Sequence, residues 1–297
     1  QADAAHFDLD ALADEIAFAQ HPLVPVLRRF EALCGEPAAG YIHWGATTQN
    51  IFDTANALQM QGTHRLLAGH LDAALHHACE LVARHADTPM AGRTHGQHAL
   101  PMTFGLKVAG WIDELARHRE RLSLRLESSF PACMSGAIGS FAATGAMGRR
   151  VETLLASRLG LRPAGLSMRS SYDRAADYVA TLGLLAGTAQ KIGQDIVFLQ
   201  RTEVGEVAES FHMGKIGSST MAQKRNPSTA LLLVSLAGIW IAYAIDEWLR
   251  GLLMWRRWVT LGWVPHARAA HRRLRAQAAA ARSDPDAALQ DVEAAAT

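Results

Sequence analysis

Apolar residues recur at steps of three and four positions along most of the chain. One stripe consists of Leu67, Leu71, Ala74, Leu75, Ala78 and Val82, and a second of Val108, Ile112, Leu115, Leu122 and Leu126. This spacing places the apolar side chains on one face of an α-helix. No segment alternates between apolar and polar residues clearly enough to predict a β-strand. The pattern therefore predicts an all-α fold.

The longest predicted helix covers residues 174–209, which contain no proline. As one continuous helix it would be about 54 Å long at about 1.5 Å per residue. Helices of this length are stabilised by packing along their whole length rather than by intrinsic propensity. We therefore expect a bundle of long helices, extended by association of subunits.

Residues 228–245, "STALLLVSLAGIWIAYAI", form the most apolar run of the chain. The run is long enough to be compared with a membrane span. It is the only such run, however, and it contains Ser228, Thr229 and Ser235. A single uncharged helix in a helical protein is more often buried on all sides within a bundle. We therefore expect a core helix here and no membrane association.

Composition narrows the class of protein. The chain has 297 residues, of which 49% are hydrophobic and 19% charged, so it can bury a large core. A formal net charge of +1 argues against a dedicated nucleic-acid surface. The cysteines Cys34, Cys79 and Cys133 are widely separated and odd in number, which indicates no disulfide framework and fits a cytoplasmic location.

Four irregular segments interrupt the helical pattern. They are "YIHWGATTQN" (41–50), "AGRTHGQHALP" (91–101), "CMSGAIGSFAATGAMG" (133–148) and "GKIGSSTMAQKRNP" (214–227). The third is rich in Gly and Ala and could be a loop or a close approach of helices. The chain starts with Gln1 and no signal segment, and its character changes after residue 250, so we expect a fragment. The predicted organisation is a partial N-terminal domain (1–52), a central helical bundle (53–249) and a partial C-terminal helical domain (250–297).

The segment "GSSTMAQKRNP" (217–227) combines small residues with a possible helix start. Gly and Ser allow a tight turn that exposes backbone N–H groups. Asn226 and Pro227 are typical of an N-cap and a first helical position. Lys224 would then lie beside a helix N-terminus, where an anion is favoured. These features predict an anion site next to a hydroxyl group, although composition alone favours a solvated loop before a capped helix.

Two other segments carry uncharged donors and histidines. In "RTHGQHA", Thr94 and His95 could bind a carboxylate and transfer a proton near neutral pH. A pair of structural histidines, His95 and His98, is the more frequent alternative. A metal site is not predicted, because no cysteine or carboxylate accompanies this pair. "GATTQN" is also compatible with a plain N-cap turn.

These segments resemble a known family. "GSSTMAQKRNP" is similar to the signature loop of the aspartase/fumarase superfamily, G-S-S-x-M-P-x-K-x-N-P. "HWGATTQNIFDTA" and "GRTHGQHALPMTFGLKVAGW" resemble its two other shared segments, in the same order, and "SYDRAADYV" and "QRTEVGEVAES" extend the match over about residues 20–245. The residues of these segments resemble those of the branch that contains adenylosuccinate lyase and 3-carboxy-cis,cis-muconate cycloisomerase.

The resemblance implies a homotetramer whose sites each combine segments from three subunits and take a small dicarboxylate. It implies that Ser218 is the general base that removes a proton next to a carboxylate, and that His95 donates a proton to the leaving group. The implied substrate-binding residues are Thr47, Thr48, Asn50, Thr94, Ser219, Lys224 and Asn226. The resemblance implies no cofactor and no metal.

The chain departs from the family pattern at several positions. Ala222 and Gln223 replace the usual Pro-x, and Asn50 stands where Asp is common. Tyr172 occupies a position where the branch often has Arg, which argues against a phosphate-bearing or tricarboxylate substrate. Leu231 stands where many members carry a Glu that orients and charges the catalytic histidine. Without that carboxylate, His95 is a weaker general acid.

A weak acid is tolerable when the leaving group departs as a stable anion. We therefore expect β-elimination from a substituted succinate to give fumarate, with an anionic leaving group such as the nitrite of nitrosuccinate. The alternative is a 3-carboxy-cis,cis-muconate cycloisomerase, followed by an amine-releasing lyase of the adenylosuccinate type. A non-catalytic structural tetramer is a further alternative, because some members keep the fold without the activity.

Overall fold

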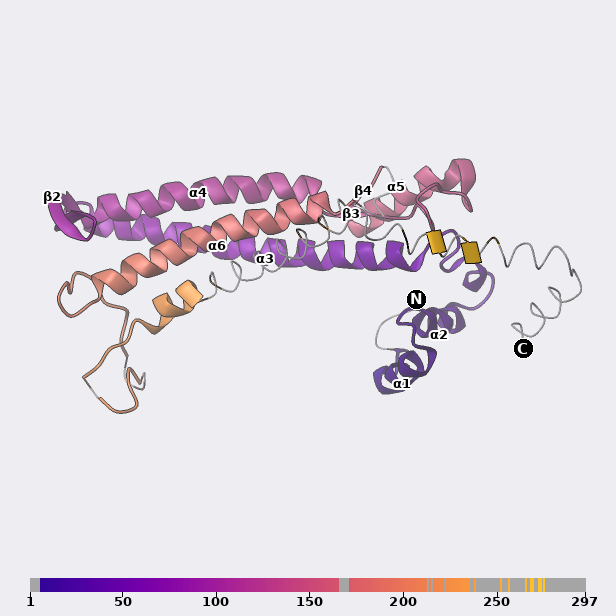
Figure 1. Ribbon diagram of the computed structural model, residues 1–297, viewed down its shortest axis with the longest axis horizontal. Coiled ribbons are helices and arrows are strands. Elements are labelled where there is room, and N and C mark those ends of the chain that lie inside the picture. The colour runs from indigo at the N-terminus through magenta and orange to yellow at the C-terminus, as the bar shows by residue number, and fades with distance from the viewer. Residues whose placement is uncertain are drawn as a thin grey trace, which may run out of the picture. The chain divides into compact units, whose positions relative to one another are not determined.

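The computed structural model describes most of the chain (Figure 1). The described residues are 6–165, 171–212, 214, 216–221, 223–235, 238, 252, 256, 265, 268, 269, 272, 273 and 275. The chain forms two compact units, residues 1–234 and residues 235–297. The elements that follow belong to the first unit.

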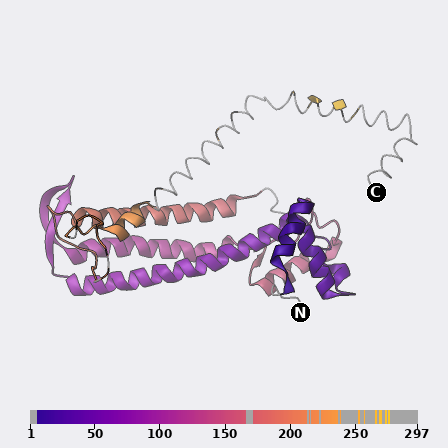
Figure 2. The same cartoon turned by 90° about the horizontal axis from the view of Figure 1, so that it is seen from below.

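Three long helices form the core of this unit. They are α3 (Thr48–His85), α4 (Phe104–Ser128) and α6 (Asp173–Leu199), and they lie side by side in both views (Figures 1 and 2). Their facing sides bury residues of both predicted stripes: Leu71, Ala78, Val108, Leu115 and Leu122. Burial of these stripes stabilises the packing of the helices. The three long helices confirm the prediction of an all-α fold.

A pair of shorter helices precedes the bundle. Asp8 caps α1 (Leu9–Ala19) by accepting a hydrogen bond from the Ala11 N–H at 3.1 Å. The second helix, α2 (Val24–Cys34), is tied to the first by an ion pair between Arg29 and Glu15 at 2.8 Å. A short 3₁₀ turn, η2 (Ala39–Tyr41), then leads to the start of α3.

A group of short elements adjoins the N-terminal end of α3. It consists of β3 (Pro131–Ala132), which pairs in parallel with β4 (Arg162–Pro163), of η3 (Gly145–Met147) and of α5 (Gly148–Leu159). Glu152 is buried inside it and accepts hydrogen bonds from the backbone N–H groups of Met134 and Gly165 at 3.0 and 3.3 Å. The Gly- and Ala-rich segment 133–148, which could have been a close approach of helices, is mostly a loop.

A β-hairpin follows α3, and the sequence pattern did not predict it. Its strands β1 (Pro89–Thr94) and β2 (Gln97–Thr103) are antiparallel and joined by a two-residue turn. That turn is His95–Gly96, with φ values of 52° and 77°, as in a type I′ turn. The strands were not predicted because a bulge interrupts the register after Ala91 and hides the alternation.

The predicted continuous helix over 174–209 was also wrong. The helix α6 ends at Leu199, and the chain turns back so that the Glu206 N–H donates to the Leu199 carbonyl at 3.0 Å. Gly205, with a φ of 62°, allows this reversal. The absence of proline did not reveal the helix end, because the helix ends at Leu199, with Gln200 as its C-cap, without a proline.

A further helical segment covers residues 228–235. It packs closely on α6, because a Cβ atom on Gly193 would lie 2.8 Å from the carbonyl oxygen of Ala230. Ala230 is only 1% exposed. The rest of the apolar run 228–245 lies outside the described residues. Among the described residues, no helix is long and apolar enough to cross a membrane.

Candidate active site

The first candidate segment lies at the N-terminal end of α3. Thr47 occupies the N-cap position and Thr48 begins the helix, and both are half-buried. Asn50 is only 5% exposed, and its Oδ1 accepts hydrogen bonds from the N–H groups of Thr47 and Gly136 at 3.1 and 3.0 Å. Asn50 is predicted to bind substrate, but its side-chain oxygen joins the helix start to the neighbouring loop.

The second segment forms the β1–β2 hairpin. Thr94 and His95 lie at its turn and are exposed. The neighbouring Arg93 makes a bidentate ion pair with Glu206, with both nitrogen–oxygen distances at 2.7 Å. Its Nη2 also lies 3.3 Å from His98 Nε2. The two histidines therefore differ, because His98 contacts the anchoring arginine whereas His95 projects from the turn.

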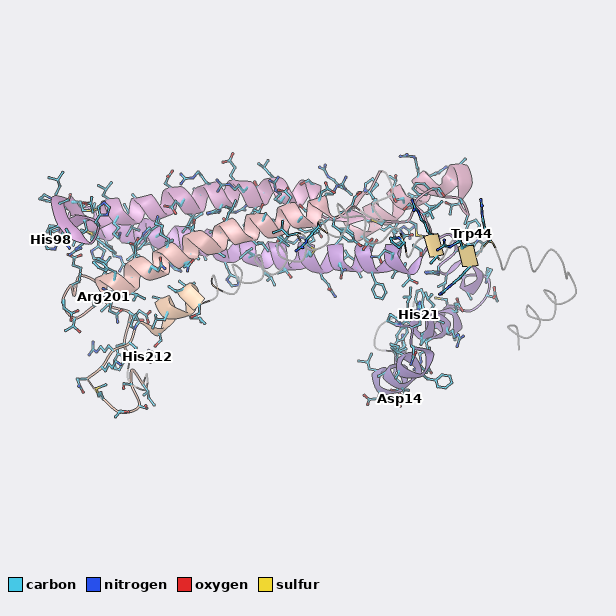
Figure 3. The ribbon with its side chains drawn as sticks, viewed as in Figure 1. Asp14, His21, Trp44, His98, Arg201 and His212 are labelled. Carbon is cyan, nitrogen blue, oxygen red and sulfur yellow. The ribbon has the colours of Figure 1, made fainter. Side chains whose placement is uncertain are left out.

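The first two segments lie at opposite ends of one helix. The 38 residues of α3 separate them, which is a length of about 57 Å at about 1.5 Å per residue. Figure 3 shows the labelled residues Trp44 and His98 at these two ends of the bundle. A single chain therefore does not bring Thr47 and Thr48 together with His95.

The third segment is a tight loop around Ser218. The Oγ of Ser218 accepts hydrogen bonds from the N–H groups of Thr220 and Met221 at 3.3 and 3.2 Å. Asn226 Nδ2 donates to the Gly217 carbonyl at 2.9 Å, which joins the two ends of the loop. A side chain at Gly217 would collide with the Lys224 carbonyl oxygen, so this position requires glycine. Lys224 and Ser219 are exposed.

The predicted N-cap at Asn226 was wrong. The side chain of Asn226 donates to the loop, and the first helical bond runs from the Leu231 N–H to the Pro227 carbonyl at 2.9 Å. The helix therefore begins one residue later than expected. The Asn226 amide stabilises the loop rather than the helix.

The anion expected at this helix N-terminus comes from the protein itself. The Glu209 carboxylate accepts hydrogen bonds from the N–H groups of Ala230 and Thr229 at 2.8 and 3.3 Å. These are the donors that a free helix start would offer to a ligand. Lys224 stays exposed, whereas these two helix N–H donors are already used.

Three residues that position the loops were missed in the sequence. Gln200 accepts a bond from the Glu209 N–H at 2.9 Å and donates to the Arg225 carbonyl at 3.2 Å, so it joins both ends of the loop. Glu206 and Glu209 complete the set. Glu206 lies 113 positions from its partner Arg93. No local periodicity reveals such a pair, although the motif "QRTEVGEVAES" includes both carboxylates.

The charges near the candidate site are mostly paired. The hydrogen bond from Arg93 lowers the pKa of the Glu206 carboxyl, which stays ionised. Burial raises the pKa of the Cys133 thiol to about 11, so this cysteine is protonated near neutral pH and is a poor nucleophile. Among the described residues, no group of three or more His, Cys, Asp or Glu side chains could hold a metal ion.

Leu231 lies on the helix that follows the loop. Its side chain is apolar and the residue is 45% exposed. This is the position at which the family pattern often has a glutamate. The neighbouring carboxylate, Glu209, is directed at the helix N-terminus and accepts backbone N–H groups there.

Taken together, the helices and loops define a helical-bundle protein whose candidate site residues lie in loops at both ends of one long helix. The lyase family model matches residues 21–239. The chain belongs to this family, and it is a member of the aspartase/fumarase superfamily, in the branch of adenylosuccinate lyase and 3-carboxy-cis,cis-muconate cycloisomerase.

Individual relatives support this assignment. The chain is 40% identical over 230 residues to N-acetyl-S-(2-succino)cysteine lyase of Enterococcus italicus, covering 77% of this chain and 50% of the relative. It is 37% identical over 241 residues to adenylosuccinate lyase of Pyrococcus abyssi, covering 81% and 53%. The structure of 3-carboxy-cis,cis-muconate lactonizing enzyme from Pseudomonas putida matches with a TM-score of 0.72 and 36% identity, covering 81% of this chain and 53% of that chain. The chain spans about half the length of these relatives.

Proposed function

We propose that the protein is a lyase that removes a leaving group by β-elimination from a substituted succinate and forms fumarate, and that the leaving group departs as an anion. The observation that carries this proposal is Leu231, which provides no carboxylate to orient and charge His95. An amine needs a proton as it leaves, whereas a stable anion does not. The match to lyases, which covers about half the length of the relatives, supports elimination as the class of reaction.

A thiolate and nitrite are the leaving groups that fit best. Thiols have a pKa of about 8.5, so a thiolate departs with little help from an acid. The relative at 40% identity is named for a succinylated cysteine, which favours a succinyl thioether as substrate. Nitrosuccinate, which releases nitrite, satisfies the same requirement at Leu231.

The proposed base is Ser218. Its Oγ accepts two backbone N–H groups, from Thr220 and Met221, and such donors stabilise negative charge on the oxygen. The proton it removes is on a carbon next to a carboxylate, where charge develops in the transition state. The proposed substrate-binding residues are Thr47, Thr48, Asn50, Thr94, Ser219, Lys224 and Asn226, of which Asn50 would contribute only through its amide nitrogen.

We further propose that the site is assembled from several copies of the chain in a homotetramer. The length of α3 separates the Thr47–Thr48 segment from His95 within one chain. Neighbouring copies that pack with α3 antiparallel would place one end of each helix beside the other end of its neighbour. Such a site would take a small dicarboxylate, in keeping with a cytoplasmic enzyme.

The test is a substrate panel. Purified protein is mixed separately with N-acetyl-S-(2-succino)cysteine, nitrosuccinate and adenylosuccinate, and fumarate is followed by ultraviolet absorbance. We expect turnover of one of the first two and loss of at least about a hundredfold in kcat for Ser218→Ala. The control variant is Ser123→Ala, whose hydroxyl bonds to the Glu120 carbonyl on α4.

Other results would contradict the proposal. Turnover of adenylosuccinate alone would show that the leaving group is an amine. Undiminished activity in Ser218→Ala would show that Ser218 is not the base. Conversion of 3-carboxy-cis,cis-muconate to its lactone would favour the cycloisomerase, which a relative of 38% identity supports. No turnover of any of these compounds would favour a structural tetramer.

A further inference from the structure

The hairpin that carries Thr94 and His95 is anchored through one arginine. The guanidinium of Arg93 makes two hydrogen bonds of 2.7 Å to the Glu206 carboxylate. It also donates to the Ala91 carbonyl at 3.3 Å. The Arg93 and Glu206 side chains are only 13% and 24% exposed. A bidentate, partly buried pair is geometrically more specific than an exposed ion pair.

Both partners of this pair are held in place. On one side, the guanidinium carbon of Arg93 lies 5.7 Å from the centre of the Phe198 ring, at the end of α6. On the other side, the Glu206 N–H donates to the Leu199 carbonyl at 3.0 Å. The pair therefore connects two fixed points, the hairpin and the turn that follows α6.

The hairpin itself bends at the position before this arginine. Gly92 lies at the bulge, and a Cβ atom there would come within 2.6 Å of the Leu100 carbonyl oxygen. A bulge changes the direction of the residues beyond it. The turn 93–98 therefore takes its direction from the bulge and needs a further contact to hold it.

We propose that the Arg93–Glu206 pair is a clamp that positions the Thr94–His95 turn against the segment leading to the Ser218 loop. The pair joins the hairpin, which carries one candidate segment, to the turn after α6 that precedes the Ser218 loop. Arg93 directly precedes Thr94, so any movement of its guanidinium is passed to the turn. Arg93 and Glu206 act here as positioning residues and make no contact with substrate. The catalytic part of this inference depends on the proposed function, whereas the structural part does not.

The structural test is amide hydrogen exchange in the full chain. In Arg93→Gln and Glu206→Gln, we expect exchange of residues 89–103 to become about tenfold faster or more, because local opening of the hairpin is no longer opposed. The charge-exchanged double variant Arg93→Glu/Glu206→Arg should recover most of the protection. The matched control is Arg119→Gln, which removes an ion pair with Asp72 within the bundle and should leave exchange of 89–103 unchanged. Unchanged exchange in both single variants would overturn the clamp.

The catalytic test uses the same variants with the substrate that the wild-type protein converts. Misplacement of a catalytic group lowers kcat more than binding, so we expect kcat to fall about tenfold or more, with KM within about twofold. The double variant should regain activity and protection together. Faster exchange with an unchanged kcat would overturn the positioning role. If the wild-type protein converts none of the substrates, the proposed function fails, and exchange alone decides whether the clamp exists.

Discussion

The two ends of α3 serve different purposes. At the N-terminal end, polar side chains are buried and bonded within the chain. Asn50 binds the Gly136 N–H, and Thr54 is bonded to both the N–H and the carbonyl of Cys133 at 3.0 and 3.3 Å. At the C-terminal end, Thr94 and His95 are exposed on a hairpin that is anchored below its turn. The comparison shows that polar side chains at one end are used within the chain, whereas those at the hairpin turn stay exposed.

The largest expected effect on stability is at Asn50. Replacement by leucine leaves two part-buried backbone N–H groups without acceptors, and losing the acceptor of a buried donor costs about 1–3 kcal/mol. We therefore expect Asn50→Leu to lower the free energy of unfolding by about 3 kcal/mol, measured by urea denaturation. Asn50→Asp keeps an acceptor oxygen and is the control. A loss below about 1 kcal/mol for Asn50→Leu would show that this end is not tied as described.

A matched pair of threonines compares the two ends directly. Thr54→Val removes a hydroxyl that is 8% exposed and bonded to Cys133, so we expect a loss of about 1–2 kcal/mol. Thr94→Val alters an exposed residue, and we expect a change within about 0.5 kcal/mol. Thermal unfolding of both variants provides the measurement. Equal losses would remove the difference between the ends.

The middle of the bundle predicts a pH dependence of stability through two buried histidines. His64 is 2% exposed, and its Nδ1 finds no hydrogen-bond partner among the described residues. Burial lowers the pKa of His64, with smaller contributions from Arg119 and Arg65. Burial also lowers the pKa of His118, which bonds to Thr188 at 2.9 Å.

The sign of this pH dependence follows from proton binding. Below the unfolded-state pKa of about 6.5, the unfolded chain binds protons that the folded chain does not. Stability should therefore fall as the pH drops below about 6.5, because the unfolded chain gains protons at His64 and His118 that the folded chain does not. His64→Leu should reduce the slope, whereas the exposed-site control His95→Gln should keep it. An unchanged slope in His64→Leu would contradict this account.

The smallest expected effect is at the hairpin turn. His95 has a φ of 52°, a conformation that asparagine adopts more readily than histidine. Asparagine followed by glycine is also favoured in type I′ turns. We therefore expect His95→Asn to raise the free energy of unfolding by up to about 0.5 kcal/mol. A clear loss of stability in urea denaturation would indicate that His95 makes structural contacts.

Particular elements show how much of the fold was predictable. The stripes through Leu71 and Leu122 predicted α3 and α4, because burial of one helix face leaves a regular pattern in the sequence. The hairpin was missed because its bulge breaks the alternation of β1 and β2. The end of α6 at Leu199 was missed because the helix stops at Gln200 without a proline, and the chain reverses only later, at Gly205.

The candidate site residues were predictable in part, because local composition is visible in the sequence. Motifs located Ser218, Thr94 and His95, since each lies in a short segment with an unusual composition. They did not show that Glu209 occupies the helix N-terminus expected to bind an anion. They also did not identify Gln200 as the residue that joins the ends of the loop. Such contacts form between segments that are distant or irregularly spaced along the chain.

The amino-acid sequence by itself determined the helical class, the long core helices and the three polar segments, because periodicity and local composition are properties of neighbouring residues. Only the tertiary structure decided which polar groups are used within the chain and which remain exposed. Asn50 and Glu209 bind backbone groups of other segments, Asn226 joins the two ends of its own loop, and Arg93 binds Glu206 across 113 positions. The physical reason is that a buried donor or acceptor must be paired, and the fold alone determines which partner comes within reach.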